Sequence, residues 1–147
     1  MKFLLTPELG RLARWLRAVG YDAEVLRGRI PDLLAKATED GRIILTRHLA
    51  LRDHRGTPIR LVRSDRFDAQ LKELRRSCGI RVSTKQLFLR CLLCNVPVKR
   101  IAKEKVKGKV PPYVFKTQND FSQCPSCQRL YWAATHWEHA SQILKML

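Results

Sequence analysis

The segment Lys2–Gly20, KFLLTPELGRLARWLRAVG, encodes one strand followed by one helix, and the first half of the chain repeats this pattern. Residues 2–5 form a short, mainly apolar run, which is typical of a buried strand. Apolar side chains then recur every three or four residues across 8–19, which predicts an amphipathic helix. The residues on its apolar face are Leu9, Leu12, Ala13, Leu16 and Val19. Gly20 follows at the position where glycine commonly ends a helix.

The same alternation of strands and helices continues to about residue 78. We expect strands at 22–26, 42–46 and 60–63, helices at about 31–39 and 65–78, and a last turn or two at 84–89. Such alternation predicts an α/β fold, a parallel sheet flanked by helices. In these folds the functional crevice lies at the carboxyl ends of the strands. Those ends are expected at residues 6–8, 26–31, 46–48 and 64–65.

Two Cys-x-x-Cys pairs, Cys91 with Cys94 and Cys124 with Cys127, follow the predicted α/β region. The gap between the pairs is long enough for a small β-ribbon that returns the second pair to the first. Four thiolates complete the tetrahedral shell of a structural zinc ion and leave no open position for chemistry. The pattern therefore predicts one structural zinc site. Two redox pairs, or two disulfides, are the alternatives.

The chain is strongly basic, because 29 Lys and Arg residues face only 13 Asp and Glu residues, a formal net charge of +16. A balance of this size favours a polyanionic partner, most often nucleic acid. Arginine predominates over lysine before residue 91, and guanidinium groups bind phosphate bidentately and stack on bases. A solubilising surface is the alternative. A membrane surface is not favoured, since no stretch pairs a basic face with exposed aromatic side chains.

The sequence also bears on the compartment. No apolar run is long enough to span a bilayer, and the apolar start at residues 1–5 is too short for a signal peptide. Cys78 lies outside the two pairs, and the resulting odd number of thiols argues against export. We therefore expect the cytoplasm or another reducing compartment. An organelle reached through a removed transit peptide is the alternative.

Several stretches, taken in order, carry a resemblance to a known family. They are GRLARWLR at 10–17, GYD at 20–22, GRIILTR at 41–47, VRSD at 62–65, RCLLCN at 90–95, VPP at 110–112, YW at 131–132 and THW at 135–137. Together they resemble the C-terminal ribonuclease domain of the Mut-seven exonuclease family, over nearly the whole chain. The resemblance implies a PIN-like α/β domain at 1–90 and a zinc ribbon with a C-terminal helix at 91–147.

The resemblance further implies a cluster of acidic residues at the strand ends that holds Mg²⁺ or Mn²⁺ for phosphodiester hydrolysis. Two of the family's Asp positions fall on Thr6 and His48 in this chain. Asp65 matches the family, whereas Asp32 and Glu8 are displaced substitutes. A hard divalent cation needs several oxygen ligands. We therefore expect weak or absent cleavage, with Asp65, Asp32 and Glu8 catalytic only if the chain is active.

Basic side chains near the strand ends, on the first helix and after the first cysteine pair are expected to contact RNA. The candidates are Arg11, Arg14, Arg17, Arg47, His48, Arg63, Lys103, Lys105 and Lys107. A solvated surface is the alternative for the helix and for the lysines, and Trp15 is interpreted as a packing residue. His48 with His54 offers metal-free acid–base chemistry on a ribose hydroxyl as a further alternative. His136 is interpreted as support for the cysteine site rather than as a ligand.

We interpret the chain as an RNA-binding protein with a PIN-like domain and a zinc ribbon. Its expected partner is structured RNA or a ribonucleoprotein particle, and RNA is favoured over DNA only through the family resemblance. An active metal-dependent ribonuclease and a zinc-ribbon adaptor for protein partners are the alternatives. Zinc is the expected structural cofactor, and Mg²⁺ or Mn²⁺ is expected only for the ribonuclease alternative.

Overall fold

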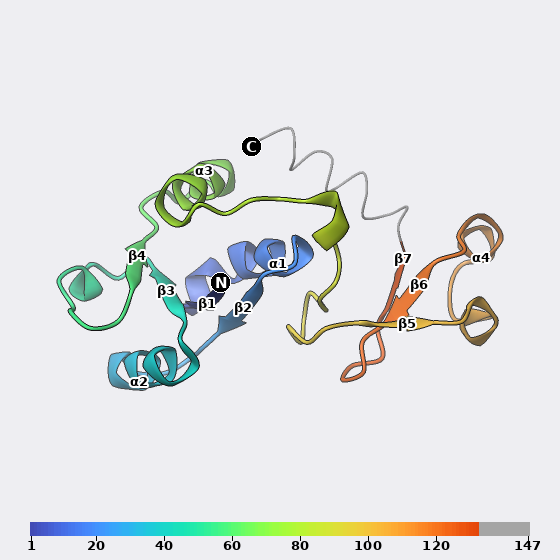
Figure 1. The fold of residues 1–147 in the computed structure, drawn as a ribbon, viewed down its shortest axis with the longest axis horizontal. Helices are drawn as coiled ribbons and strands as arrows, with labels where there is room; N and C mark the ends of the chain where they lie inside the picture. Colours follow the sequence, from blue (N-terminus) through green and yellow to red (C-terminus); the bar gives the residue numbers. More distant parts are fainter. Residues whose placement is uncertain (133–147) are drawn as a thin grey trace.

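The computed structural model describes residues 1–132, which form two sheets that lie side by side (Figure 1). The strands of the larger sheet are β1 (Lys2–Leu5), β2 (Asp22–Val25), β3 (Ile43–Thr46) and β4 (Ile59–Leu61). Their order is β2-β1-β3-β4, and every neighbouring pair is parallel. The predicted α/β fold with a parallel sheet is therefore confirmed. β4 ends two residues earlier than predicted, although the Val62 N–H still donates to the Thr46 carbonyl at 2.8 Å.

Helices cover both faces of this sheet. They are α1 (Gly10–Ala18), α2 (Ile30–Asp40) and α3 (Phe67–Cys78). Phe3 and Leu5 pack with α1 and α3, whereas Leu4 and Ile44 pack with α2. Successive side chains of a strand point to opposite faces of the sheet. Because helices cover both faces, both sets of side chains are apolar, as is usual in parallel sheets. Trp15 is buried in the α1 cluster, which confirms its predicted packing role.

Two short 3₁₀ turns, η1 (Pro7–Leu9) and η3 (Thr84–Gln86), replace parts of the predicted helices. A third, η2 (Leu49–Leu51), follows β3, where no helix was predicted. The first helix therefore starts at Gly10 rather than Glu8, after the Gly10 N–H has closed a turn onto the Pro7 carbonyl. The helical segment predicted at 84–89 is reduced to η3, and the positive φ of 55° at Phe88 is incompatible with its continuation.

The smaller sheet is antiparallel, in the order β5-β6-β7. Its elements are β5 (Lys99–Ile101), η4 (Lys103–Val106), α4 (Pro112–Thr117), β6 (Phe121–Gln123) and β7 (Leu130–Trp132). Val106, Val114 and Phe121 form its core, with Trp132 packed against them. The basic segment that starts at Lys99 begins as β5 and continues as the η4 turn, in which Val106 is buried.

The strands of the parallel sheet precede residue 90, and those of the antiparallel sheet follow it. The antiparallel sheet, which we call the ribbon, lies beyond β2, an edge strand of the parallel sheet (Figure 1). Between residues 1 and 132, no helix combines the length and the apolar character needed to cross a bilayer. The expected C-terminal helix, together with His136 and Trp137, lies outside the described residues.

Candidate metal centre and nucleic-acid interface

The four predicted ligand cysteines lie together. The Sγ atoms of Cys91, Cys94, Cys124 and Cys127 are all within 4.8 Å of one another, and all four thiols are free. The first pair precedes β5, and the second pair occupies the turn between β6 and β7. Pairing of these strands brings together two segments that are 30 residues apart in the chain. The geometry suits a metal ion such as zinc, which four thiolates bind in a closed tetrahedral shell.

Each pair forms a knuckle with the same backbone geometry. The Cys94 N–H donates to Cys91 Sγ, and the Cys127 N–H donates to Cys124 Sγ, both at 3.4 Å. The residue after each pair, Asn95 or Gln128, has a φ of 62° in the left-handed region. Backbone N–H groups that converge on sulfur favour the thiolate form, which is the form that binds metal.

Tyr131 of β7 supports the first knuckle. Its hydroxyl lies 3.1 Å from Cys91 Sγ and accepts a 3.1 Å hydrogen bond from the Leu92 N–H. Burial opposes ionisation of Cys91, but hydrogen bonds from Tyr131 and from the backbone of Cys94 and Leu93 outweigh it and lower the Cys91 pKa to about 6. Sequence reasoning missed this role of Tyr131, since nothing local links residue 131 to residue 91.

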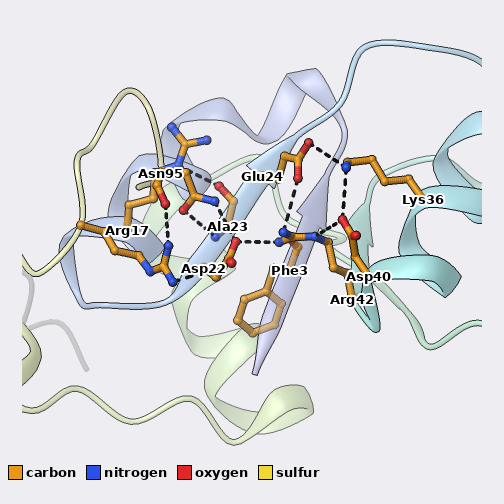
Figure 2. A network of polar contacts seen from close by, with 10 residues as sticks. Phe3, Arg17, Asp22, Ala23, Glu24, Lys36, Asp40, Arg42 and Asn95 are labelled. Carbon is orange, nitrogen blue, oxygen red and sulfur yellow. Dashed lines mark hydrogen bonds and ion pairs between the residues drawn. The ribbon is translucent and has the colours of Figure 1, made fainter. Parts of the chain in front are cut away.

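Arg17 fixes the first knuckle to the parallel sheet. Its Nε donates to the Ala23 carbonyl at 2.7 Å (Figure 2). Its Nη1 donates to the carbonyls of Leu92 and Leu93 at 2.7 and 2.9 Å. The residue is only 7% exposed. The prediction that Arg17 contacts RNA phosphate is therefore corrected, and the alternative of a solvated surface does not hold for this residue either. The knuckle covers this part of α1, and the carbonyl groups of the chain occupy the guanidinium.

Asn95 makes the second connection between knuckle and sheet. Its Nδ2 donates to Asp22 Oδ1 at 2.7 Å, and its Oδ1 accepts from the Ala23 N–H at 3.0 Å (Figure 2). These bonds satisfy backbone and side-chain groups of the edge strand β2, which a sheet edge otherwise leaves unpaired. The knuckle therefore holds a defined position beside α1 and β2.

Asp22 also belongs to an ionic network behind this joint. Arg42 donates to Asp22 Oδ1 at 2.6 Å, to Asp40 Oδ2 at 3.0 Å and to the Phe3 carbonyl at 3.2 Å (Figure 2). Burial raises the pKa of Asp22, but hydrogen bonds from Arg42 and Asn95 outweigh burial, so the pKa lies below its usual value. The network connects β1, β2, α2 and β3 at the end of the sheet opposite to the strand carboxyl termini.

At those carboxyl termini, the strand order places a topological switch between β1 and β3, which is where α/β sheets bind ligands. Thr6 follows β1, and its hydroxyl donates to Glu8 Oε1 at 2.5 Å and lies 3.1 Å from Thr46 Oγ1. The Arg47 N–H donates to the same Glu8 oxygen at 3.3 Å, and His48 Nε2 lies 3.8 Å from it. Thr6 and His48, which stand where acids were expected, thus surround the carboxylate of Glu8.

The carboxylate of Glu8 is stabilised as an anion by its neighbours. Partial burial raises its pKa, but the hydrogen bond from Thr6, the backbone N–H groups of Glu8 and Arg47, and the nearby His48 together lower it. Glu8 therefore occupies the place predicted for a substitute acid. Its Oε1 is already hydrogen-bonded by the protein.

The other two predicted acids do not join Glu8. Asp32 accepts hydrogen bonds from the backbone N–H and Nε of Arg29 at 3.2 and 3.4 Å, and so it caps the start of α2. Asp65 is exposed in the loop after β4. Apart from the four cysteines, no group of three or more Asp, Glu, His or Cys side chains among residues 1–132 is close enough to hold a metal ion. Asp65, Asp32 and Glu8 are therefore not brought together as a metal site.

A different carboxylate occupies the end of β4. Glu73 of α3 accepts hydrogen bonds from the backbone N–H groups of Arg63 and Ser64, at 2.8 and 3.0 Å. Sequence reasoning missed this acid because it lies eight residues beyond the motif at 62–65, in the second turn of α3. It tethers the loop that carries Asp65 and places a negative charge beside Arg63.

The comparisons with known proteins bear on this arrangement. The family model described as the Mut7-C RNAse domain matches residues 1–144. This chain belongs to the Mut7-C RNAse domain family. No curated protein and no solved structure matches the chain. The match confirms the resemblance to the C-terminal ribonuclease domain of the Mut-seven family, and it makes RNA the expected substrate or partner.

In this Mut7-C member the switch point opens into a hollow of about 410 Å³. Thr6 and His48 line one side, and Arg27 and Arg29 of the β2–α2 loop line the other. The two arginines were not among the predicted RNA contacts. The sequence held a usable signal, since Arg27 and Arg29 directly follow a strand that ends at the expected crevice.

The remaining predicted RNA contacts fall into separate regions. Arg11, Arg14 and Arg47 are exposed near the carboxyl ends of β1 and β3. Lys105 and Lys107 are exposed in and beside η4, which follows β5 at the end of the ribbon away from the parallel sheet (Figure 1). Lys103, also in η4, packs over the Phe115 ring and donates to Asn119. The lysines and the arginines therefore do not form one continuous surface.

Proposed function

We propose that this Mut7-C RNAse family member binds RNA through the basic carboxyl edge of its parallel sheet, with weak or absent metal-dependent cleavage. The proposal rests on the switch point between β1 and β3. There Thr6 and His48 lie beside Glu8, where the family resemblance implied an acidic cluster. Hydrolysis by this type of enzyme needs divalent cations that polarise the phosphate and activate water. A single, already hydrogen-bonded carboxylate supplies too few oxygen ligands for that role.

The charge around the hollow supports direct binding of RNA phosphate. Arg27 and Arg29 line it together with His48, and Arg47 is exposed next to His48. An acidic metal site repels phosphate until the cations arrive, whereas this edge attracts phosphate without them. Basic side chains that neutralise phosphates release counterions, and this release drives binding.

The cysteine site has a structural role in this proposal. Zinc held by Cys91, Cys94, Cys124 and Cys127 joins the two knuckles and leaves no position for substrate. Hydrogen bonds made by Arg17 and Asn95 fix the position of the first knuckle against the parallel sheet. We propose RNA, free or within a ribonucleoprotein particle, as the partner and a reducing compartment as the location, because reduced thiols are needed for the site.

An active metal-dependent ribonuclease is the second candidate, favoured by the family match and by the position of Glu8. Fluorescence anisotropy of zinc-loaded protein with labelled RNA, in buffer without Mg²⁺ or Mn²⁺, distinguishes the two. We expect binding that needs no added cation and weakens steeply as salt rises. RNA binding that appears only after Mg²⁺ or Mn²⁺ is added would favour the ribonuclease.

A further inference from the structure

A second depression, of about 960 Å³, lies between α1, the β2–α2 loop and the tip of the first knuckle. Arg11 and Arg14 of α1 line one side, Arg27 lines the other, and Leu93 of the knuckle closes one end. We call it the arginine groove. We infer that the arginine groove binds the backbone of a single-stranded RNA segment and directs it from the strand-end hollow toward the zinc knuckle. The inference rests on the proposed function and extends it to the form and route of the RNA.

Four arginines line the groove. Arg17 is buried and occupied by backbone carbonyls, whereas Arg11, Arg14 and Arg27 are exposed. Among residues 1–132, no carboxylate forms an ion pair with Arg11, Arg14 or Arg27, and the lining of the groove includes no Asp or Glu. The Arg11 guanidinium lies over the Phe67 ring, 4.5 Å from its centroid, which orients the guanidinium plane. Arginines on two walls, without acidic partners, suit a chain of phosphates rather than a solvated helix face.

The groove adjoins the hollow at the switch point. Pro7 and Arg27 line both depressions, Pro7 from the turn before α1 and Arg27 from the loop after β2. A polyanion that leaves the hollow beside Thr6 and His48 therefore reaches the groove by passing Pro7 and Arg27. Arg27 lies at the junction, where it can contact phosphates in both depressions.

The remaining lining favours a single strand over a duplex. Pro7, Val25 and Leu93 give the groove an apolar component, and Leu93 is 45% exposed although it is a large hydrophobic residue. Arg17 holds this tip in place through its 2.9 Å hydrogen bond to the Leu93 carbonyl. An apolar tip and guanidinium planes can contact sugars and base faces. Unpaired nucleotides expose their base faces, whereas a duplex buries them by stacking.

The test compares two pairs of substitutions that remove the same charge. Arg14→Ala with Arg27→Ala removes two groove arginines. Arg55→Ala with Arg76→Ala removes two exposed arginines that do not line the groove. Anisotropy with labelled oligouridylate should show about tenfold or greater loss of affinity for the groove pair and about twofold or less for the control pair.

A third variant tests the knuckle tip at constant charge. Leu93→Ser should weaken binding of oligouridylate while the salt dependence and the zinc content stay unchanged, since no phosphate contact is removed. A photo-crosslinking residue placed at position 93 should label oligouridylate in preference to an RNA duplex of the same length.

The outcomes separate the inference from the function on which it rests. Equal losses for the two arginine pairs, with RNA binding retained in the wild type, overturn the groove but leave the proposed function intact. Tighter binding of duplex than of single strand, or displacement of RNA by polyglutamate at equal charge concentration, also overturns it. Failure of the wild type to bind any RNA overturns both.

Discussion

The Thr6 hydroxyl donates a 2.5 Å hydrogen bond to Glu8 Oε1 at the carboxyl end of β1. The same oxygen accepts from the Arg47 N–H, and His48 lies 3.8 Å away. Protein donors therefore already satisfy the carboxylate at the switch between β1 and β3. A divalent cation at this point would have to displace those donors and would find few other oxygen ligands, whereas an RNA phosphate meets histidine and arginine.

Restoring the family's acids should exchange phosphate binding for metal binding. In Thr6→Asp with His48→Asp, we expect higher Mn²⁺ affinity, because two carboxylates join Glu8, and weaker RNA binding without metal. Calorimetric titration of Mn²⁺ and RNA anisotropy measure the two effects. The control is His54→Asp with Ser77→Asp, which adds acids at two exposed positions away from the switch point. If both variants bind Mn²⁺ equally, Thr6 and His48 do not mark the metal position.

Zinc should be bound at one ion per chain and should be needed for the ribbon to fold. Cys124→Ser removes a buried ligand, so elemental analysis should show loss of zinc and circular dichroism should show loss of strand signal. Cys78→Ser is the matched control, because Cys78 is a free thiol outside the cluster. Wild-type protein without zinc, or full zinc content in Cys124→Ser, contradicts the assignment.

The joint between knuckle and sheet should contribute measurably to stability. Asn95→Ala removes the hydrogen bonds to Asp22 and Ala23 and forces alanine into a φ of 62°. We expect a loss of about 2–4 kcal/mol in the free energy of unfolding, from two hydrogen bonds and a left-handed conformation.

Asn95→Gly is the control for backbone strain, since glycine adopts positive φ freely. It should lose the hydrogen bonds alone and be less destabilised than Asn95→Ala by about 1 kcal/mol. Urea denaturation measures both variants. Wild-type stability in Asn95→Ala would show that the knuckle does not depend on this contact.

Acid should weaken the Asp22 network. The pKa of Asp22 is lowered in the folded state below its ordinary value of 3.8, because the hydrogen bonds from Arg42 and Asn95 outweigh burial. The resulting stabilisation is complete above that value and is lost as pH falls through the folded pKa. The stability difference between wild type and Asp22→Asn should therefore be larger at neutral pH than in acid. A difference that does not change with pH excludes this role for Asp22.

The sequence predicted features that depend on local pattern. The apolar periodicity around α1 predicted a buried face, and the five side chains of that face are buried, namely Leu9, Leu12, Ala13, Leu16 and Val19. The spacing of the cysteines predicted a shared metal site. Each Cys-x-x-Cys pair forms a knuckle through local backbone contacts, and two such knuckles supply the four ligands of one ion. The carboxyl ends of β1 and β3 were also placed correctly, whereas β2 and β4 end one and two residues earlier than predicted. All four ends meet at one edge of the sheet, because the strands are parallel.

Features that depend on distant contacts were missed or misread. Arg17 has the helical position of a solvated residue, and only the docking of residues 92–93 reveals its structural role. Asp32 and Asp65 were candidate metal ligands only for an active ribonuclease, and the structure separates them, since Asp32 caps α2 and Asp65 lies in an exposed loop. The groove role of Arg27 depends on how the β2–α2 loop faces α1, which no local pattern encodes.

The most direct test of the central claim is an RNA cleavage assay with zinc-loaded protein, in Mn²⁺, under conditions where anisotropy shows the RNA to be bound. We predict bound, intact RNA, with no difference between the wild type, Glu8→Gln and Asp65→Asn, because no acidic cluster holds the cation. Cleavage by the wild type that either substitution abolishes would contradict the account and would establish the chain as an active metal-dependent ribonuclease.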